Sequence, residues 1–265
     1  MTLHYTESGN FEGETIVYLH GAGLAGWSWQ DIMTRLPQYH NMAVDLPGHG
    51  DSHTIQARTF ADMAHYVADL IADVTPHGKA NVVGISLGGM TTLALLEHRP
   101  EVVSSVVVSG VNAIPLPFMT KMMTRAMIPV IKSNFVIRQN AKMFQLDEEA
   151  SAAYFTSMKQ LDLETFKNLL PEIFNFAPAE QLRDINHPTL VVAGSQEEKI
   201  NVKSVSLLAN AMNNAIGVLA PDLHHAWSAE NPKLFADMVH QWISSQEIAT
   251  GLDLVVDKGQ QVAFA

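Results

Sequence analysis

The sequence contains no cysteine, few basic residues and no long uninterrupted hydrophobic run. Without cysteine the chain forms no disulfide, has no thiol nucleophile and binds no metal through sulfur. Lys and Arg number 16 against 27 Asp and Glu, a formal net charge of −11, and a surface of that sign repels the phosphates of nucleic acid. The N-terminus shows no basic region followed by an apolar run, and no stretch approaches the length of a membrane span. We therefore expect a cytoplasmic protein without a nucleic-acid partner or an integral membrane segment.

The composition is that of a folded chain with a large core. Hydrophobic residues make up 47% of its 265 positions and charged residues 16%, which suits one large domain and argues against disorder. Twelve histidines are present, but no His-Glu-x-x-His pattern and no clustered acids accompany them. We therefore predict no metal site and no cofactor.

Hydrophobic periodicity predicts an α/β fold with a mostly parallel, doubly wound sheet. Short β-branched runs that end in glycine-rich or polar loops alternate with segments whose apolar residues recur at helical spacing. The expected strands span residues 3–8, 15–19, 42–44, 81–85, 102–109, 189–194 and 216–219. The expected helices span residues 27–36, 59–74, 91–98, 202–212 and 232–243, the second with Thr59 as its N-cap. Residues 246–265 carry no clear signal.

The alternation stops between the strands at 102–109 and 189–194. This segment has helical periodicity, no convincing strand, and breaks expected at Pro115, Pro117, Pro129 and Pro171. Because it is rich in Phe, Met, Leu and Ile that need burial, we interpret residues 113–178 as an inserted helical cap on a core formed by residues 1–112 and 179–265. Flexible methionines adapt to apolar ligands, so Met119, Met123 and Phe144 are candidate lining residues of a substrate pocket.

One serine occupies a turn that displays it. The run at 81–85 passes into Gly84-Ile85-Ser86-Leu87-Gly88-Gly89 and then directly into a helix-forming segment. A strand that reverses into a helix over two or three residues needs small neighbours and leaves the serine hydroxyl exposed at the start of the helix. The helix dipole favours a developing negative charge there.

Four motifs, in order, resemble those of the α/β-hydrolase family. They are His20-Gly21-Ala22-Gly23, Asp45-Leu46-Pro47-Gly48-His49-Gly50, the Ser86 turn, and His225 followed by Glu230 and Pro232. The resemblance covers the chain apart from the cap and the C-terminal tail.

The resemblance implies a nucleophile at Ser86 and a general base at His225. A hydroxyl is a weak nucleophile until an imidazole takes its proton, and the imidazole needs a carboxylate to orient it. Relatives place an aspartate three residues after the glycine that ends the seventh strand, and here that position is Glu197. The neighbouring Glu198 is the alternative acid, while His224 is the rival of His225 as the base.

The oxyanion formed by attack on a carbonyl needs fixed donors. The backbone N–H groups of Ala22 and Leu87 suit this role. Trp27 and Trp227 flank the oxyanion loop and the histidine in sequence and are further candidates for the wall of the pocket. His20 and His49 are expected to make hydrogen bonds that stabilise their turns.

Residues 111–146 carry an excess of positive charge. They contain Lys121, Arg125, Lys132, Arg138 and Lys142 and no acid, although the chain as a whole is negative. One interpretation is a face that attracts an anionic or amphiphilic substrate, and the other is a solvated face that balances acidic surroundings.

We expect a serine hydrolase that cleaves a carboxylic ester of a small apolar or amphiphilic molecule through an acyl-enzyme. The alternative uses the same residues to break a carbon–carbon bond or to perform an elimination, as relatives acting on dienoic diketo acids or in the menaquinone pathway do. A third interpretation is a ligand-binding protein with slow turnover. The expected partner is a small-molecule substrate, and the sequence carries no signal for an oligomeric state.

Overall fold

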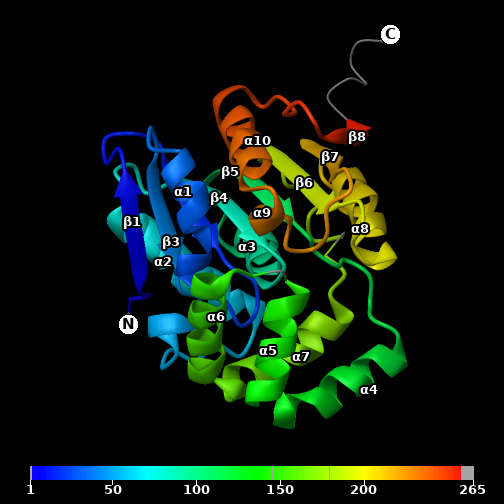
Figure 1. Ribbon diagram of the computed structural model, residues 1–265. Coiled ribbons are helices and arrows are strands. Elements are labelled where there is room, and N and C mark those ends of the chain that lie inside the picture. The colour runs from blue at the N-terminus through cyan, green and yellow to red at the C-terminus, as the bar shows by residue number, and fades with distance from the viewer. Residues whose placement is uncertain (1, 145, 179, 258–265) are drawn as a thin grey trace.

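A computed structural model, in which residues 2–144, 146–178 and 180–257 are described, contains an eight-stranded sheet (Figure 1). The strand order is β1-β3-β2-β4-β5-β6-β7-β8. Strands β2 to β7 run parallel to one another, while β1 pairs antiparallel with β3 at one edge and β8 pairs antiparallel with β7 at the other. The strands are β1 Tyr5–Gly9, β2 Thr15–Leu19, β3 His40–Val44, β4 Ala80–Ile85, β5 Val103–Ser109, β6 Thr189–Gly194, β7 Ala215–Ala220 and β8 Asp253–Asp257.

Helices cover both faces of the sheet, which explains why its central strands are mostly apolar and buried throughout. Every residue of β2, β3, β4 and β6 is buried, as expected of parallel strands packed on two sides. One apolar cluster joins the sheet to α2 (Phe60–Val74), α3 (Leu87–His98) and α8 (Lys199–Ala211). A second joins the other face to α1 (Gln30–Arg35), α9 (Trp227–Glu230) and α10 (Pro232–Ser245). The predicted α/β sheet is confirmed.

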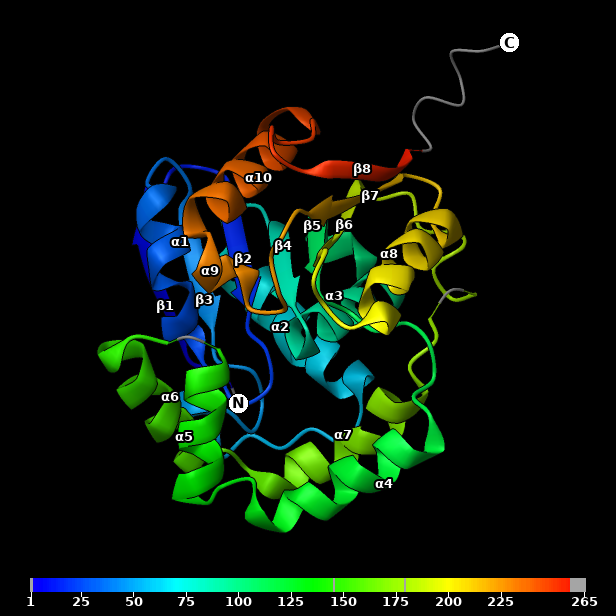
Figure 2. The same cartoon turned by 45° about the vertical axis from the view of Figure 1, so that its right-hand side comes forward.

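Four helices lie between β5 and β6 in the chain and gather at one end of the molecule (Figure 2). They are α4 (Phe118–Met127), α5 (Asn134–Met143), α6 (Glu148–Gln160) and α7 (Leu163–Asn175). Two loop contacts attach them to the core. The N–H of Asp162 donates to the carbonyl of Gly48 at 2.8 Å, and a Cβ on Gly48 would lie 2.9 Å from the side chain of Thr165.

Most elements match the sequence-based prediction, with three informative differences. The serine helix α3 begins at Leu87 rather than at residue 91. Pro171, expected to break a helix, lies inside α7, which holds because Phe166, Leu170 and Phe174 on both sides of it are buried. The tail forms β8, which adds an antiparallel edge strand beside β7, and residues 258–265 lie outside the described part. Thr59 caps α2 as predicted, in a reciprocal box with Asp62.

Short 3-10 turns connect several of these elements. They are η1 (Gly26–Trp29), η2 (Gly50–Ser52), η3 (Pro100–Val102) and η4 (Ile128–Val130). Among the described residues, no helix is both long and apolar enough to cross a membrane.

Candidate active site

Ser86 sits in a strained turn between β4 and α3. Its φ of 55° and ψ of −114° lie in a region that L-residues rarely adopt. Every residue from 80 to 96 is buried except Ser86, which is partly exposed. Glycine is required on both sides of the turn, because a Cβ on Gly84 would meet the hydroxyl of Thr92 and one on Gly88 would meet the carbonyl of Leu19. The strand–turn–helix therefore displays one hydroxyl at the edge of the core.

A histidine and a carboxylate make a direct contact in the loops after β7 and β6. The Nδ1 atom of His225 lies 2.7 Å from Oε2 of Glu197. The Glu197 side chain is completely buried, whereas that of His225 is 40% exposed. The amide of Asn201 donates to Oε2 of Glu197 at 2.8 Å, and the N–H of Gly194 donates to Oε1 at 2.9 Å. These donors leave the carboxylate one orientation, toward the imidazole.

This pair lies beside the serine turn. The N–H of Ser86 donates to the carbonyl of Ser109 at 2.9 Å, and the next residue, Gly110, is packed against His225. A Cβ on Gly110 would lie 2.9 Å from Cε1 of His225 and 3.3 Å from Oε2 of Glu197. Gly110 has a φ of +61°, so the chain needs glycine here both for its backbone and for the ring. Ser86 and His225 therefore each contact one of two adjacent residues, Ser109 and Gly110.

The two partners shift each other's pKa. Burial by itself would raise the pKa of Glu197, but the hydrogen bond and charge of His225, with the bonds from Asn201 and Gly194, lower it below its usual value. Burial by itself would lower the pKa of His225, but the hydrogen bond and charge of Glu197, helped by the charge of Glu198, raise it above its usual value. The carboxylate is therefore ionised at neutral pH and strengthens the imidazole as a proton acceptor.

The rival residues do not take part in this contact. Glu198 is exposed and stands at the N-cap position of α8. His224 is exposed, and its Nδ1 lies 3.1 Å from Oε2 of Glu230. Of the two glutamates and two histidines that the sequence offers, the structure brings Glu197 and His225 together.

Two backbone N–H groups are free next to Ser86. In the described part of the chain, neither the N–H of Ala22 nor that of Leu87 donates to another group. Leu87 opens α3 directly after the serine. The loop that holds the exposed Ala22 passes close by, since a Cβ on Gly21 would lie 3.6 Å from the Cβ of Ser86. Two donors of this kind suit an oxyanion.

Two buried histidines hold the loop of Ala22 in place. His20 donates from Nδ1 to the carbonyl of Gly21 at 2.8 Å and accepts at Nε2 from the N–H of Leu46 at 3.0 Å. His49 donates from Nδ1 to the carbonyl of Pro47 at 3.0 Å, and its ring lies 5.1 Å from that of His20. The prediction that both stabilise their turns is confirmed. Burial lowers the pKa of His20 to about 4 and that of His49 to about 3, so both are neutral.

These neutral histidines predict a loss of stability in mild acid. An unfolded histidine has a pKa of about 6.5, so below that pH the unfolded chain binds protons that the folded chain does not. The free energy of unfolding therefore falls as the pH drops from about 6.5 toward 4. We expect His49→Asn, which keeps a donor for Pro47, to reduce this slope by about one proton, or about 1.4 kcal/mol per pH unit. Urea unfolding at a series of pH values measures the slope, and an unchanged slope would contradict the burial argument.

Helix α6 packs an apolar surface onto the loop of Ala22. The side chain of Met158 lies directly against Gly23, whose φ is +77°. The indole N–H of Trp27 donates to the hydroxyl of Ser157 at 2.8 Å. Leu24, Trp27 and Phe144 pack against one cluster with Ile137, Tyr154 and Met158. Trp27 and Phe144, two predicted lining residues, therefore pack in the same cluster as Met158, which contacts the loop of Ala22 at Gly23.

The other three predicted lining residues do not belong to this cluster. Trp227 is fully buried in the core, where its ring lies 4.6 Å from that of Phe235 at a tilted angle and its indole N–H donates to the hydroxyl of Ser109 at 2.9 Å. It has no surface to offer a substrate, since α9 turns its indole inward. Met119 and Met123 are each 67% exposed on α4 and belong to none of the apolar clusters of the described residues. Trp227 thus supports Ser109, the backbone partner of Ser86, from within the core, while Met119 and Met123 lie on the exposed surface of α4.

Sequence reasoning missed three residues of the site. Asn201 lies in the first turn of α8, and its amide reaches back to Glu197 in the loop before the helix. Gly110 ends β5, and Met158 is one of several methionines in the helical segment. Only their neighbours in space distinguish these residues.

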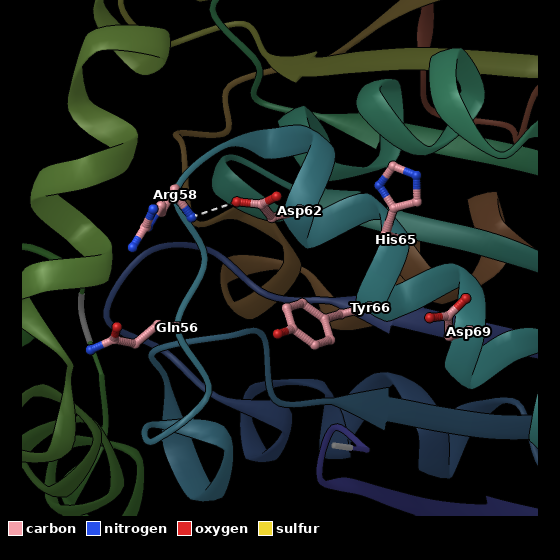
Figure 3. A pocket seen from close by; sticks show the side chains of 6 residues that line it. All are labelled: Gln56, Arg58, Asp62, His65, Tyr66 and Asp69. Carbon is pink, nitrogen blue, oxygen red and sulfur yellow. Dashed lines mark hydrogen bonds between the residues drawn. The ribbon is translucent and has the colours of Figure 1, made fainter.

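Two further groups of polar residues lie away from Ser86. His4, Asp45 and Asp51 bring their ligand atoms within 4.8 Å of one another, but Asp45 already accepts from the N–H groups of Gly26 and Asp51 at 2.7 and 2.8 Å. A hollow of about 460 Å³ opens beside α2 (Figure 3). It is lined by Gln56, Arg58, Asp62, His65, Tyr66 and Asp69. None of these belongs to the serine site.

Comparison with known proteins shows which sequences and folds this chain is similar to. A model described as "Alpha/beta hydrolase family" matches residues 16–238. An AB hydrolase superfamily protein of Gibberella zeae is 29% identical over 96% of this chain and 88% of its own length. The 2-hydroxy-6-oxo-6-(2'-aminophenyl)hexa-2,4-dienoic acid hydrolase of Metapseudomonas resinovorans is 22% identical over 91% of this chain and 87% of its own. A solved thermophilic esterase from Thermogutta terrifontis superposes with a TM-score of 0.76 at 20% identity, covering 91% of this chain and 92% of that one.

Proposed function

Because the chain belongs to the α/β-hydrolase family, we propose that it is a serine hydrolase that cleaves a carboxylic ester through an acyl-enzyme. The observation that carries the proposal is the 2.7 Å contact between His225 and a fully buried Glu197, beside a serine held in a strained turn. A nucleophile, a base and a group that orients the base are the three parts that activate a hydroxyl.

In the proposed mechanism Ser86 attacks the ester carbonyl while His225 takes its proton at Nε2. Glu197 holds the other nitrogen, Nδ1, which fixes the tautomer and stabilises the imidazolium. The N–H groups of Ala22 and Leu87 donate hydrogen bonds to the oxyanion of the tetrahedral intermediate. His225 then gives its proton to the leaving alcohol, and water hydrolyses the acyl-enzyme with His225 again as the base.

We propose that residues 113–178 form the cap that selects the substrate. Support comes from the packing of α6 on the loop of Ala22, where Met158 contacts Gly23 and Ser157 bonds to Trp27. A polar or charged acyl group would lose its hydration against Leu24, Trp27 and Met158. The proposed substrate is therefore a small apolar or amphiphilic ester.

Hydrolysis of p-nitrophenyl esters of increasing acyl length tests this proposal. We expect clear turnover and a maximum of kcat/KM at one chain length, because an apolar site gains affinity with each buried CH₂, by about 0.8 kcal/mol, until it is full. No turnover of any ester, by protein that is folded by circular dichroism, would contradict ester cleavage. A profile without dependence on length would contradict an apolar cap.

The second candidate is cleavage of a carbon–carbon bond by the same residues. The similarity to the dienoic acid hydrolase over 91% of this chain favours it. It predicts turnover of a 2-hydroxy-6-oxo-hexa-2,4-dienoic acid, followed by loss of the dienol absorbance, at a kcat/KM above that of the best p-nitrophenyl ester. Tight binding of such a compound with negligible turnover by either assay would instead indicate a ligand-binding protein.

A further inference from the structure

Helix α4 turns its apolar side outward. None of its ten residues is buried. Its methionines at positions 119, 122, 123 and 127 are 67%, 46%, 67% and 46% exposed, and Phe118 is 72% exposed. At 100° per residue these methionines, with Ala126, occupy one side of the helix. An amphipathic helix of a globular protein ordinarily buries this side against the core.

The polar side of α4 faces the protein instead. The ammonium of Lys121 donates to the amide oxygen of Asn175 on α7 at 2.7 Å. The guanidinium of Arg125 lies 5.2 Å from the ring centre of Phe174, also on α7. A hydrogen bond and a cation–ring contact thus attach α4 to α7 and leave the methionine side exposed.

Further exposed apolar residues follow α4 in the chain. Val130 in η4, and Phe135 and Met143 on α5, are 45%, 73% and 67% exposed. Eight of the eleven large hydrophobic residues that are exposed within the described residues lie between positions 118 and 143. So strong a concentration on one segment marks an interaction surface.

The charge of the same segment indicates the partner. Residues 111–146 carry five cations and no acid, so the remainder of the chain carries −11 − 5 = −16. Arg138 and Lys142 are exposed on α5, and the first acids to follow are Asp147 and two glutamates at the start of α6. A second copy of the chain pairing through this surface would set cations against cations. An anionic partner with an apolar interior satisfies both features.

We propose that α4, η4 and α5 dock the protein on the surface of an anionic lipid membrane. Methionine and phenylalanine side chains enter the boundary between headgroups and acyl chains, while Arg138 and Lys142 meet the lipid phosphates. The helix lies in the plane of the interface and spans nothing. The cap, and with it the proposed substrate site, is then held at the lipid surface, where amphiphilic molecules concentrate.

Co-sedimentation with vesicles tests the docking surface. The probes are vesicles of phosphatidylcholine alone and of phosphatidylcholine with about 30 mol % phosphatidylglycerol. We expect binding to the anionic vesicles, at least roughly tenfold weaker binding to the neutral ones, and a strong loss at about 0.5 M salt. Met119→Gln/Met123→Gln and Arg138→Gln/Lys142→Gln are each expected to reduce the partition coefficient by roughly tenfold or more.

The matched control is Leu254→Gln/Val255→Gln, which removes two exposed apolar side chains from β8 at 49% and 39% exposure. It is expected to bind like the unaltered protein. Thermal unfolding followed by circular dichroism shows that each variant is folded. Equal binding to neutral and anionic vesicles, or equal binding by the methionine variant and the unaltered protein, would overturn the proposal. So would a dimer, detected by sedimentation equilibrium, that Met119→Gln/Met123→Gln converts to monomer.

Discussion

Replacing Ser86 by alanine is expected to reduce kcat for p-nitrophenyl esters by roughly 10³- to 10⁶-fold, the range for loss of a nucleophile that acts together with its base. The physical reason is that no other hydroxyl occupies the partly exposed position between β4 and α3, where residues 80–96 are otherwise buried. The loss should fall on kcat, because the free N–H groups and the apolar surface that bind the ester stay in place. Steady-state kinetics with the ester of optimal acyl length measures it.

Ser244→Ala is the matched control. Ser244 lies exposed on α10, and its hydroxyl donates to the carbonyl of His240 at 2.8 Å. It makes no hydrogen bond to Ser86, His225 or Glu197. It should leave kcat within about twofold, as surface substitutions do. If Ser86→Ala kept the rate of the unaltered protein, the turnover would not proceed through Ser86, and the acyl-enzyme mechanism would fall with it.

Replacing Glu197 by glutamine is expected to lower kcat by roughly 10²- to 10⁴-fold. Glutamine keeps the size of the side chain but loses the charge that stabilises the imidazolium, and its amide nitrogen cannot accept the proton of Nδ1. The NH₂ group of the glutamine would also face the donors of Asn201 or Gly194, which now bond to the carboxylate, and would leave a buried donor without an acceptor. The same ester assay measures the loss.

The pH profile separates this role from a structural one. His225 must be neutral to accept a proton, so kcat/KM falls as the pH drops through its pKa, which Glu197 raises above its usual value. In Glu197→Gln the pKa of His225 loses that support, and the acid limb of the profile should move to lower pH. A variant that were merely less stable would lose activity without moving the limb.

Glu198→Gln is the control for the acid. Glu198 is exposed at the N-cap position of α8 and bonds to neither nitrogen of His225. Its charge contributes only the smallest of the influences on the pKa of His225. We expect kcat within a fewfold of the unaltered protein and a small shift of the acid limb, since an exposed charge is well screened. A larger loss of kcat in Glu198→Gln than in Glu197→Gln would show that Glu198, and not Glu197, is the acid that supports His225.

Local sequence patterns were sufficient to predict the strands that are buried on both faces and the helices that bury one side. The run Thr15–Leu19 was predicted to the residue, because a short run of apolar and β-branched residues between two glycine-rich turns favours a buried strand. The strand β8 was not predicted. Its apolar run is only Leu254, Val255 and Val256 between two aspartates, and it is ordered by pairing with β7 at the edge of the sheet rather than by its own periodicity.

Local patterns were misleading in the cap. A methionine-rich, amphipathic helix predicts burial of its methionines, whereas Met119 and Met123 were candidates for a pocket because flexible methionines adapt to apolar ligands. In the structure α4 is attached by Lys121 and Arg125, and the methionine side is exposed. The orientation of a helix about its own axis depends on what lies next to it, and α7 offers Asn175 and the ring of Phe174.

The sequence by itself determined the α/β sheet and the turn of Ser86. A strand that ends in Gly-x-Ser-x-Gly before a helix allows one backbone geometry, since side chains at Gly84 and Gly88 would collide with Thr92 and Leu19. The resemblance favoured Glu197 and His225 by their motif positions and left Glu198 and His224 as alternatives, and only the tertiary structure decided between them by bringing Glu197 and His225 into contact. Glu197 and Glu198, like His224 and His225, are adjacent and chemically equal in sequence, and they differ because the turn after β6 aims one carboxylate into the buried gap between Gly194, Asn201 and His225. Loops from distant parts of the chain meet there, and their meeting is a property of packing that no local pattern contains.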